Sequence, residues 1–192
     1  VLLPVVALVA LFQLEAHVLE QRRPPQRART LKERAQLLRQ VGQLEEAAQA
    51  LEEAAELLPE DVQARVLLAY VRQAQGRVDE AERVLREVLA SRPQDPAAAV
   101  PLARLLLETG RPLDAAEVLE PELGAIRKVT DPVERVDALL VAGRAAAGKG
   151  ALLQAEALFR EATRVGPGPV TTVAKAAAEA YLALASLLTR SG

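Results

Sequence analysis

The 192-residue sequence contains no cysteine, no tryptophan and a single histidine, His17. The lack of cysteine excludes disulfides, thiolate zinc sites, iron–sulfur clusters and cysteine nucleophiles. One histidine leaves almost nothing from which to build a serine–histidine hydrolase or a multi-histidine metal centre. Aromatic residues make up only 2% of the chain, which argues against recognition of single-stranded nucleic acid by base stacking.

Neither sign of charge is in large excess. The 24 basic and 26 acidic residues give a net charge of −2, so we expect no nucleic-acid partner. Apolar residues make up 51% of the chain, which is ample for a buried core and excludes a disordered polar tail. The composition therefore indicates a folded chain, and any functional site has to be identified from the order and spacing of its residues.

The segment 1–14 (VLLPVVALVALFQL) carries no charged side chain. As a helix it would span about 21 Å, short of the hydrocarbon core of about 30 Å; further apolar residues in front of Val1, or Glu15–Leu19 at the interface, would complete a span. Arg22 and Arg23 follow as a basic flank, and positive residues favour the cytoplasmic side. We predict a single transmembrane helix over residues 1–21, with residues 1–20 contacting the membrane. The alternatives are a secretory-signal remnant or a helix buried in protein.

A short linker is predicted after this helix. Pro24 and Pro25 interrupt helices, so residues 22–27 are predicted to form a basic, proline-containing linker. Beyond the linker the composition is that of an amphipathic, alanine- and leucine-rich helical chain.

Four glycines recur along the chain; the first two intervals between them are equal and the third is longer. An alanine lies five residues after each glycine, and a large apolar residue lies nine residues after it. Three of the glycines are also followed by a proline at one constant distance. The glycines are Gly42, Gly76, Gly110 and Gly150, the alanines are Ala47, Ala81, Ala115 and Ala155, and the prolines are Pro59, Pro93 and Pro167. A fixed period of about 34 residues indicates a repeat architecture.

This pattern resembles the tetratricopeptide repeat family over residues 28–169. The resemblance implies an all-α fold, a right-handed solenoid of about four helix-turn-helix units over residues 28–61, 62–95, 96–131 and 132–169. The spacing itself has a physical reason, because glycine permits the positive φ that ends a helix and small residues let helices pack closely. A C-terminal capping helix is predicted over residues 170–192, and no strand pattern is visible.

The third unit departs from the period. Glu122 occupies a position that is usually small, and six extra residues separate the third unit from the fourth. We predict that a lengthened second helix and a loop absorb them, with Thr130 or Asp131 capping the next helix before Pro132.

No catalytic or metal-binding pattern stands out. The segment Gly143–Gly150 nearly spells a phosphate-binding loop, but Gly150 replaces the required serine or threonine and the segment is predicted to be helical. The pairs Glu45–Glu46 and Glu52–Glu53 are interpreted as solvated i,i+4 partners. We therefore predict no enzymatic activity, no cofactor, no metal and no small-molecule substrate.

The family resemblance implies a protein-binding groove lined by the first helix of each unit. It is basic near the membrane end and largely apolar beyond, which suits a partner segment with an acidic end and an apolar body. Arg104 and Tyr70 are the strongest single candidates, because their residue types recur at binding hot spots. The predicted groove residues are Arg29, Lys32, Gln36, Arg39, Gln63, Val66, Tyr70, Gln73, Val100, Arg104, Leu107, Leu140 and Arg144.

The sequence thus predicts a protein-interaction scaffold anchored at a membrane, single-pass, with its repeats on the cytoplasmic side. Its expected role is that of an assembly factor or accessory subunit of a membrane protein complex, and its composition is compatible with a bacterial source. Two alternatives stay open. The first is a structural subunit whose N-terminal helix packs in a larger assembly, and the second is a soluble repeat adaptor that binds a peptide.

Overall fold

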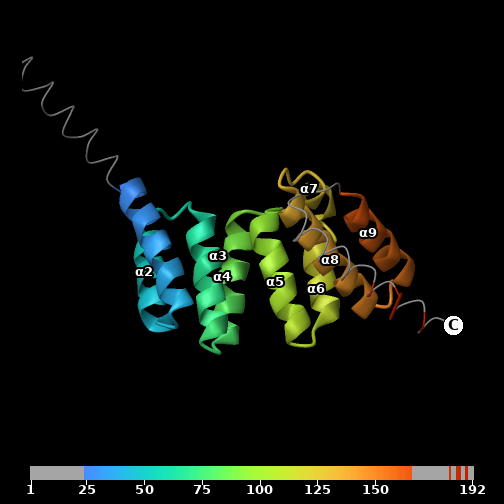
Figure 1. Ribbon diagram of the computed structural model, residues 1–192, viewed down its shortest axis with the longest axis horizontal. Helices are drawn as coiled ribbons and strands as arrows, with labels where there is room; N and C mark the ends of the chain where they lie inside the picture. Colours follow the sequence, from blue (N-terminus) through green and yellow to red (C-terminus); the bar gives the residue numbers. More distant parts are fainter. Residues whose placement is uncertain (1–23, 166–181, 183–184, 187–188, 190–192) are drawn as a thin grey trace, which may run out of the picture. The chain divides into compact units, whose positions relative to one another are not determined.

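The computed structural model describes residues 24–165 together with residues 182, 185, 186 and 189. Every regular element in this part of the chain is a helix (Figure 1), and it contains no strand, which confirms the predicted all-α fold. The first described helix covers residues 24–40. The helices after it are α2 (Leu44–Leu57), α3 (Val62–Ala74), α4 (Val78–Ser91), α5 (Pro96–Glu108), α6 (Pro112–Leu119), α7 (Leu123–Ile126), α8 (Pro132–Gly148) and α9 (Leu152–Arg164).

The chain divides into two compact units, Val1–Val84 and Leu85–Gly192, and the division falls inside α4. Below, unit 1 denotes the described residues 24–84 and unit 2 the described residues 85–165. Each unit is built from helix pairs joined by tight turns, and each has its own core.

The turns inside the helix pairs share one geometry. Gly42 has a φ of +82°, and the N–H of Gln43 donates to the carbonyl of Leu38 at 2.9 Å. This bond closes a Schellman motif, in which a left-handed residue ends the helix and satisfies its last carbonyls. The other predicted turn glycines, at 76, 110 and 150, also have positive φ and are followed by the equivalent bond. The sequence prediction for these glycines is confirmed.

The core of unit 1 is built largely from alanine. Ala28 and Ala35 of the first helix and Ala47 and Ala54 of α2 are all 0–1% exposed, with Leu51 at 1% beside them. Small side chains on facing helices let the backbones approach closely, so larger neighbours can interdigitate around them. The alanine that follows each turn glycine by five residues is therefore a packing requirement.

In unit 2, α8 is the central helix. It contacts α5, α6, α7 and α9. Gly143 of α8 lies against the ring of Phe159 on α9, and a Cβ added at Gly143 would stand 2.4 Å from the ring atom Cε1. Phe159 is 1% exposed, so the ring occupies the space that a side chain at position 143 would need.

The insertion in the third repeat takes a different form from the one predicted. The second helix of this repeat is short: α6 ends at Leu119 and a separate helix, α7, begins at Leu123. Pro121 explains the break, because proline has no N–H with which to continue the hydrogen bonds of the helix. The predicted lengthened helix is therefore wrong. The predicted cap is confirmed at Asp131, whose side chain accepts hydrogen bonds from the N–H groups of Val133 and Glu134.

Residues 24–27, which the sequence placed in a linker, are helical. The proline ring fixes φ near the helical value, and burial of Ala28 and Leu31 in the core holds this segment in the helix. That part of the predicted linker is therefore corrected.

The predicted hydrophobic helix at residues 1–21, its flank at Arg22 and Arg23, and most of the predicted helix at 170–192 lie outside the described residues. Of the last segment, residues 182, 185, 186 and 189 are described and are helical and exposed.

Candidate functional site

In unit 1, Lys32 joins the first helix to α3. Its ammonium lies 2.6 Å from a carboxylate oxygen of Asp61 and 3.0 Å from the amide oxygen of Gln63. The Lys32 and Asp61 side chains are each 17% exposed. Asp61 is also the N-cap of α3, where it accepts from the backbone N–H of Gln63. Two predicted groove residues, Lys32 and Gln63, thus hold neighbouring helices together.

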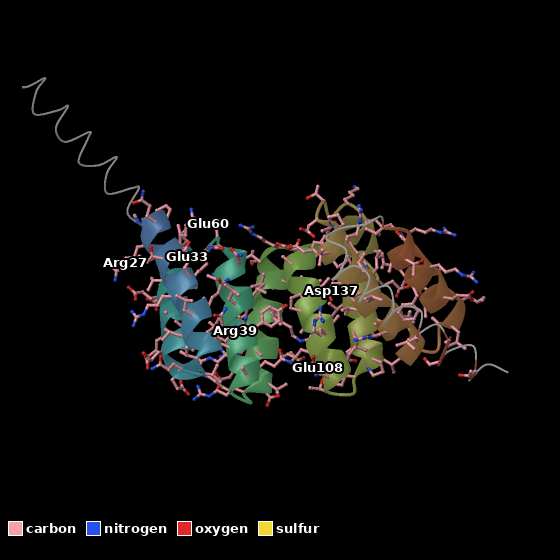
Figure 2. All side chains as sticks on the ribbon, viewed as in Figure 1. Arg27, Glu33, Arg39, Glu60, Glu108 and Asp137 are labelled. Carbon is pink, nitrogen blue, oxygen red and sulfur yellow. The ribbon has the colours of Figure 1, made fainter. Side chains whose placement is uncertain are left out.

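The remaining predicted residues of the first helix lie on the surface. Arg29 pairs with Glu33 one turn further along, at 3.0 Å. Gln36 and Arg39 are exposed and border a small depression. Figure 2 shows Arg39 towards the C-terminal end of this helix and Arg27 towards its other end.

On α3, the predicted residues differ in access. Val66 is 9% exposed and belongs to the buried set, so it is not available to a partner. Tyr70 and Gln73 are half-buried.

In unit 2, Arg104 of α5 forms an ion pair with Asp137 of α8. The guanidinium that the sequence singled out therefore ties two neighbouring first helices together. Val100 and Leu140 are 8% and 5% exposed, so these two predicted groove residues are core residues. Of the other two predicted residues, Leu107 is half-buried and Arg144 is exposed.

Three of the four acidic residues in these α2 pairs bond a residue outside α2. Glu45 pairs with Arg77, Glu52 with Arg72, and Glu53 with Arg27. The interpretation of Glu45, Glu52 and Glu53 as i,i+4 partners is therefore wrong. Their interpretation as solvated residues is confirmed for Glu45, Glu46 and Glu52, which are exposed.

Two features of unit 2 were not predicted from the sequence: the ion pair of Arg127 and the burial of Glu122. Arg127 donates two side-chain hydrogen bonds from Nε and Nη2 to Glu161, at 2.9 and 3.0 Å, and these bonds raise the pKa of the Arg127 guanidinium. Glu122 is 3% exposed, and burial together with the nearby Asp95 carboxylate raises the pKa of its carboxyl group.

A shallow depression with a volume of about 10 Å³ lies where α6 stops short. Its floor includes Ala142 and Ala146 of α8, and the ion pair of Glu120 with Lys149, at 3.2 Å, stands at its edge. This volume has room for about one water molecule and is far below the usual range of small-molecule sites, about 300–1,000 Å³.

The glycines that resemble a phosphate-binding loop serve the packing of helices. Gly143 and Gly148 both belong to α8, and a Cβ at Gly148 would stand 2.3 Å from Cβ of Pro112. Both glycines are thus needed for close packing of helices. Within the described part of the chain, no group of three or more histidine, aspartate or glutamate side chains is placed to hold a metal ion.

Comparison with known families identifies the repeats. A profile described as Tetratricopeptide repeat matches residues 38–99 and 74–121, and a second profile with the same description matches residues 100–169. Together they span residues 38–169 of the 192. The chain belongs to the tetratricopeptide repeat family. Repeats of this kind are protein-interaction modules, so the surfaces described above are candidate protein-binding surfaces.

Solved structures of other repeat proteins have the same fold. A structure from a functional characterisation of Pseudomonas aeruginosa PilF has a TM-score of 0.66 and 22% identity, covering 88% of this chain and 78% of that one. A structure of MamA from Desulfovibrio magneticus RS-1 has a TM-score of 0.59 and 19% identity, covering 85% of this tetratricopeptide repeat protein and 94% of that chain. At these identities the likeness concerns the fold.

A comparison with curated proteins found no match. None of the helices in the described residues combines the length and the apolar character of a membrane span. The predicted span of this tetratricopeptide repeat protein, residues 1–21, lies outside that part.

Proposed function

We propose that this chain is a non-enzymatic scaffold that holds other proteins at a membrane, as an assembly factor or accessory subunit of a membrane protein complex. The observation that carries the proposal is the tetratricopeptide repeat array over residues 38–169, preceded in the same chain by the uncharged segment 1–14 and a basic flank. The repeats supply the protein-binding surface, and the uncharged segment is proposed to supply the anchor.

The proposed orientation follows from charge. Arg22 and Arg23 come directly before the repeat array, and basic residues that flank a span favour the cytoplasmic side. The repeats are therefore proposed to face the cytoplasm, where partner subunits would be bound.

The test uses the full chain and two changes in its uncharged segment. Val9→Lys places a charge in the apolar run, whereas Val9→Leu keeps it apolar. If the segment lies in lipid, Val9→Lys releases the protein from membranes on alkaline extraction and Val9→Leu does not, because a central lysine costs about 2.5–3.5 kcal/mol in a membrane helix.

A third variant separates lipid from protein contacts. Reordering residues 1–14 with their composition unchanged keeps hydrophobicity but destroys shape complementarity. A lipid anchor retains membrane binding in this variant, whereas a helix packed into a larger assembly loses it. Release of all variants and the parent chain alike under mild washing would contradict the membrane proposal and favour the soluble adaptor.

A further inference from the structure

One face of the first helix is exposed, and we call it the open face. It consists of residues three or four positions apart, which lie on one side of a helix: Thr30, Arg34, Leu37 and Val41. The N–H of Val41 donates to the carbonyl of Leu37 at 3.1 Å, which continues the helical hydrogen bonds as far as Val41. All four residues are exposed, Leu37 at 63% and Val41 at 71%.

The same face is buried in later repeats. One period further on, Ala64, Leu68 and Val71 of α3 are 0%, 8% and 1% exposed and belong to one buried cluster with residues of α2. The equivalent residues of α8, which packs against α6, are also buried: Ala138, Ala142 and Ala145. In both repeats the second helix of the preceding repeat packs on the first helix. The open face is therefore one that this fold ordinarily covers with a helix.

The open face carries one unbalanced charge. Arg34 occupies the position of Leu68 in α3, and it makes no hydrogen bond or ion pair with any residue that the structure describes. Glu33, beside it in the sequence, is paired with Arg29. Two copies of this chain that met through this face would bring two Arg34 guanidinium groups together, and like charges repel. The face therefore suits a different protein, one that brings a carboxylate and aliphatic side chains.

The segment before the first helix does not repeat the pattern of a covering helix. In α2, Ala47, Leu51 and Ala54 are each at most 1% exposed. One period earlier the sequence has polar residues at the same three places, Gln13, His17 and Glu20. A covering helix in the repeat register would bury these side chains, which costs free energy unless each finds a partner. The sequence therefore favours a covering helix from another protein.

We propose that the open face binds an amphipathic helix of a partner protein. Alanine and leucine side chains of that helix cover Leu37 and Val41, and an aspartate or glutamate at its edge pairs with Arg34. The helix lies on the first helix as α2 lies on α3. This proposal rests on the proposed function and names how one partner is held.

The test measures binding of synthetic peptides to the full chain in detergent by fluorescence anisotropy, with empty micelles as the background. The reference peptide is about 18 residues long, because shorter helices are unstable in water. It carries a face of leucine and alanine with one glutamate at the edge. A second peptide has glutamine in place of the glutamate, and a third has alanine in place of the leucines.

The three peptides should bind the parent chain differently. We expect the glutamine peptide to bind about threefold more weakly than the reference peptide, the value of one exposed ion pair. The alanine peptide should bind about tenfold more weakly, because less apolar surface is buried.

Two pairs of variants assign binding to the open face. Arg34→Gln should remove the preference for glutamate over glutamine, whereas Arg39→Gln, on another face of the same helix, should keep it. Leu37→Glu should weaken binding of the reference peptide about tenfold. Leu153→Glu is the matched control, because Leu153 of α9 is 83% exposed, and it should bind as the parent does. Circular dichroism confirms that each variant is folded.

Any of three results overturns the proposal. The first is equal binding of the three peptides by the parent chain, and the second is an unchanged preference for glutamate in Arg34→Gln. The third is a concentration-dependent dimer that Leu37→Glu dissociates, which would make a second copy the occupant. The membrane extraction of Val9→Lys does not involve the open face, so a failure of this proposal is distinguishable from a failure of the proposed function.

Discussion

At the scale of single residues, Glu122 is the clearest departure from the repeat pattern. The family pattern has a small residue here, whereas this chain buries a carboxyl group that is 3% exposed. Its carboxylate accepts a hydrogen bond from the backbone N–H of Gln94 and lies near the carboxylate of Asp95, the N-cap of α5. The second oxygen, Oε2, is buried and makes no hydrogen bond within the described residues. The ionised carboxylate of Glu122 is therefore destabilised in the folded chain.

The structure predicts that Glu122→Gln stabilises unit 2 at neutral pH. Glutamine keeps an oxygen for the Gln94 N–H and removes the buried charge, so the free energy of unfolding at pH 7 should rise by about 1 kcal/mol. Because the pKa of Glu122 is raised in the folded chain, the ionised carboxylate lowers the free energy of unfolding at pH values above that pKa. This destabilisation disappears as the pH falls from the raised pKa towards the ordinary pKa of glutamate, about 4.3. Urea unfolding at several pH values measures the difference.

Glu117→Gln is the matched control, because Glu117 is exposed on α6. Its effect should stay within about 0.5 kcal/mol at all pH values. A Glu122→Gln chain that is less stable than the parent at pH 7, or a difference that does not shrink on acidification, would contradict this account of Glu122.

At the scale of elements, close helix contacts depend on residues that have almost no side chain. The contact of α8 with α9 is the example, because Gly143 leaves room for the ring of Phe159. A methyl group there would overlap a buried ring that has no free space to enter. Gly143→Ala should therefore lower the free energy of unfolding by about 1–3 kcal/mol, the usual cost of overpacking, even though alanine favours the helix.

A second substitution makes this prediction specific. In the double variant Gly143→Ala with Phe159→Leu, the smaller side chain makes room for the methyl group. The double variant should therefore lose less stability than the sum of the two single variants, which a double-mutant cycle by chemical denaturation measures. Strict additivity would mean that the two positions do not share this space.

How far the elements could be predicted depends on what kind of signal they leave in the sequence. The turns followed directly from the glycine period, because a left-handed residue ends each first helix. The break after Leu119 was not predicted, because the six extra residues were expected to form a lengthened second helix and a loop, although Pro121 has no N–H with which to continue that helix.

The ion pairs between repeats could have been predicted from the spacing of opposite charges in the sequence. Arg104 and Asp137 are 33 residues apart, and Arg127 and Glu161 are 34 apart. Residues about one period apart face each other on adjacent repeats, so opposite charges at this spacing predict a pair. The buried groove positions, such as Val100 and Leu140, could not be predicted in the same way, since access depends on how tightly neighbouring helices approach.

At the scale of the whole molecule, the orientation proposed for the repeats can be tested because the chain has no cysteine. A single introduced thiol is then the only site for a maleimide. Glu117→Cys places it at an exposed position on α6 of the repeat array.

With the repeats in the cytoplasm, a membrane-impermeant maleimide added to sealed, right-side-out vesicles should leave Glu117→Cys unlabelled until the vesicles are opened. The reason is that Arg22 and Arg23 resist transfer across the membrane, where a basic side chain at the centre costs about 2.5–3.5 kcal/mol. Labelling of Glu117→Cys in sealed vesicles would mean that the repeats face outwards. Recovery of this variant in the supernatant would mean that residues 1–20 do not anchor the chain, and the protein-binding surface would then act in solution.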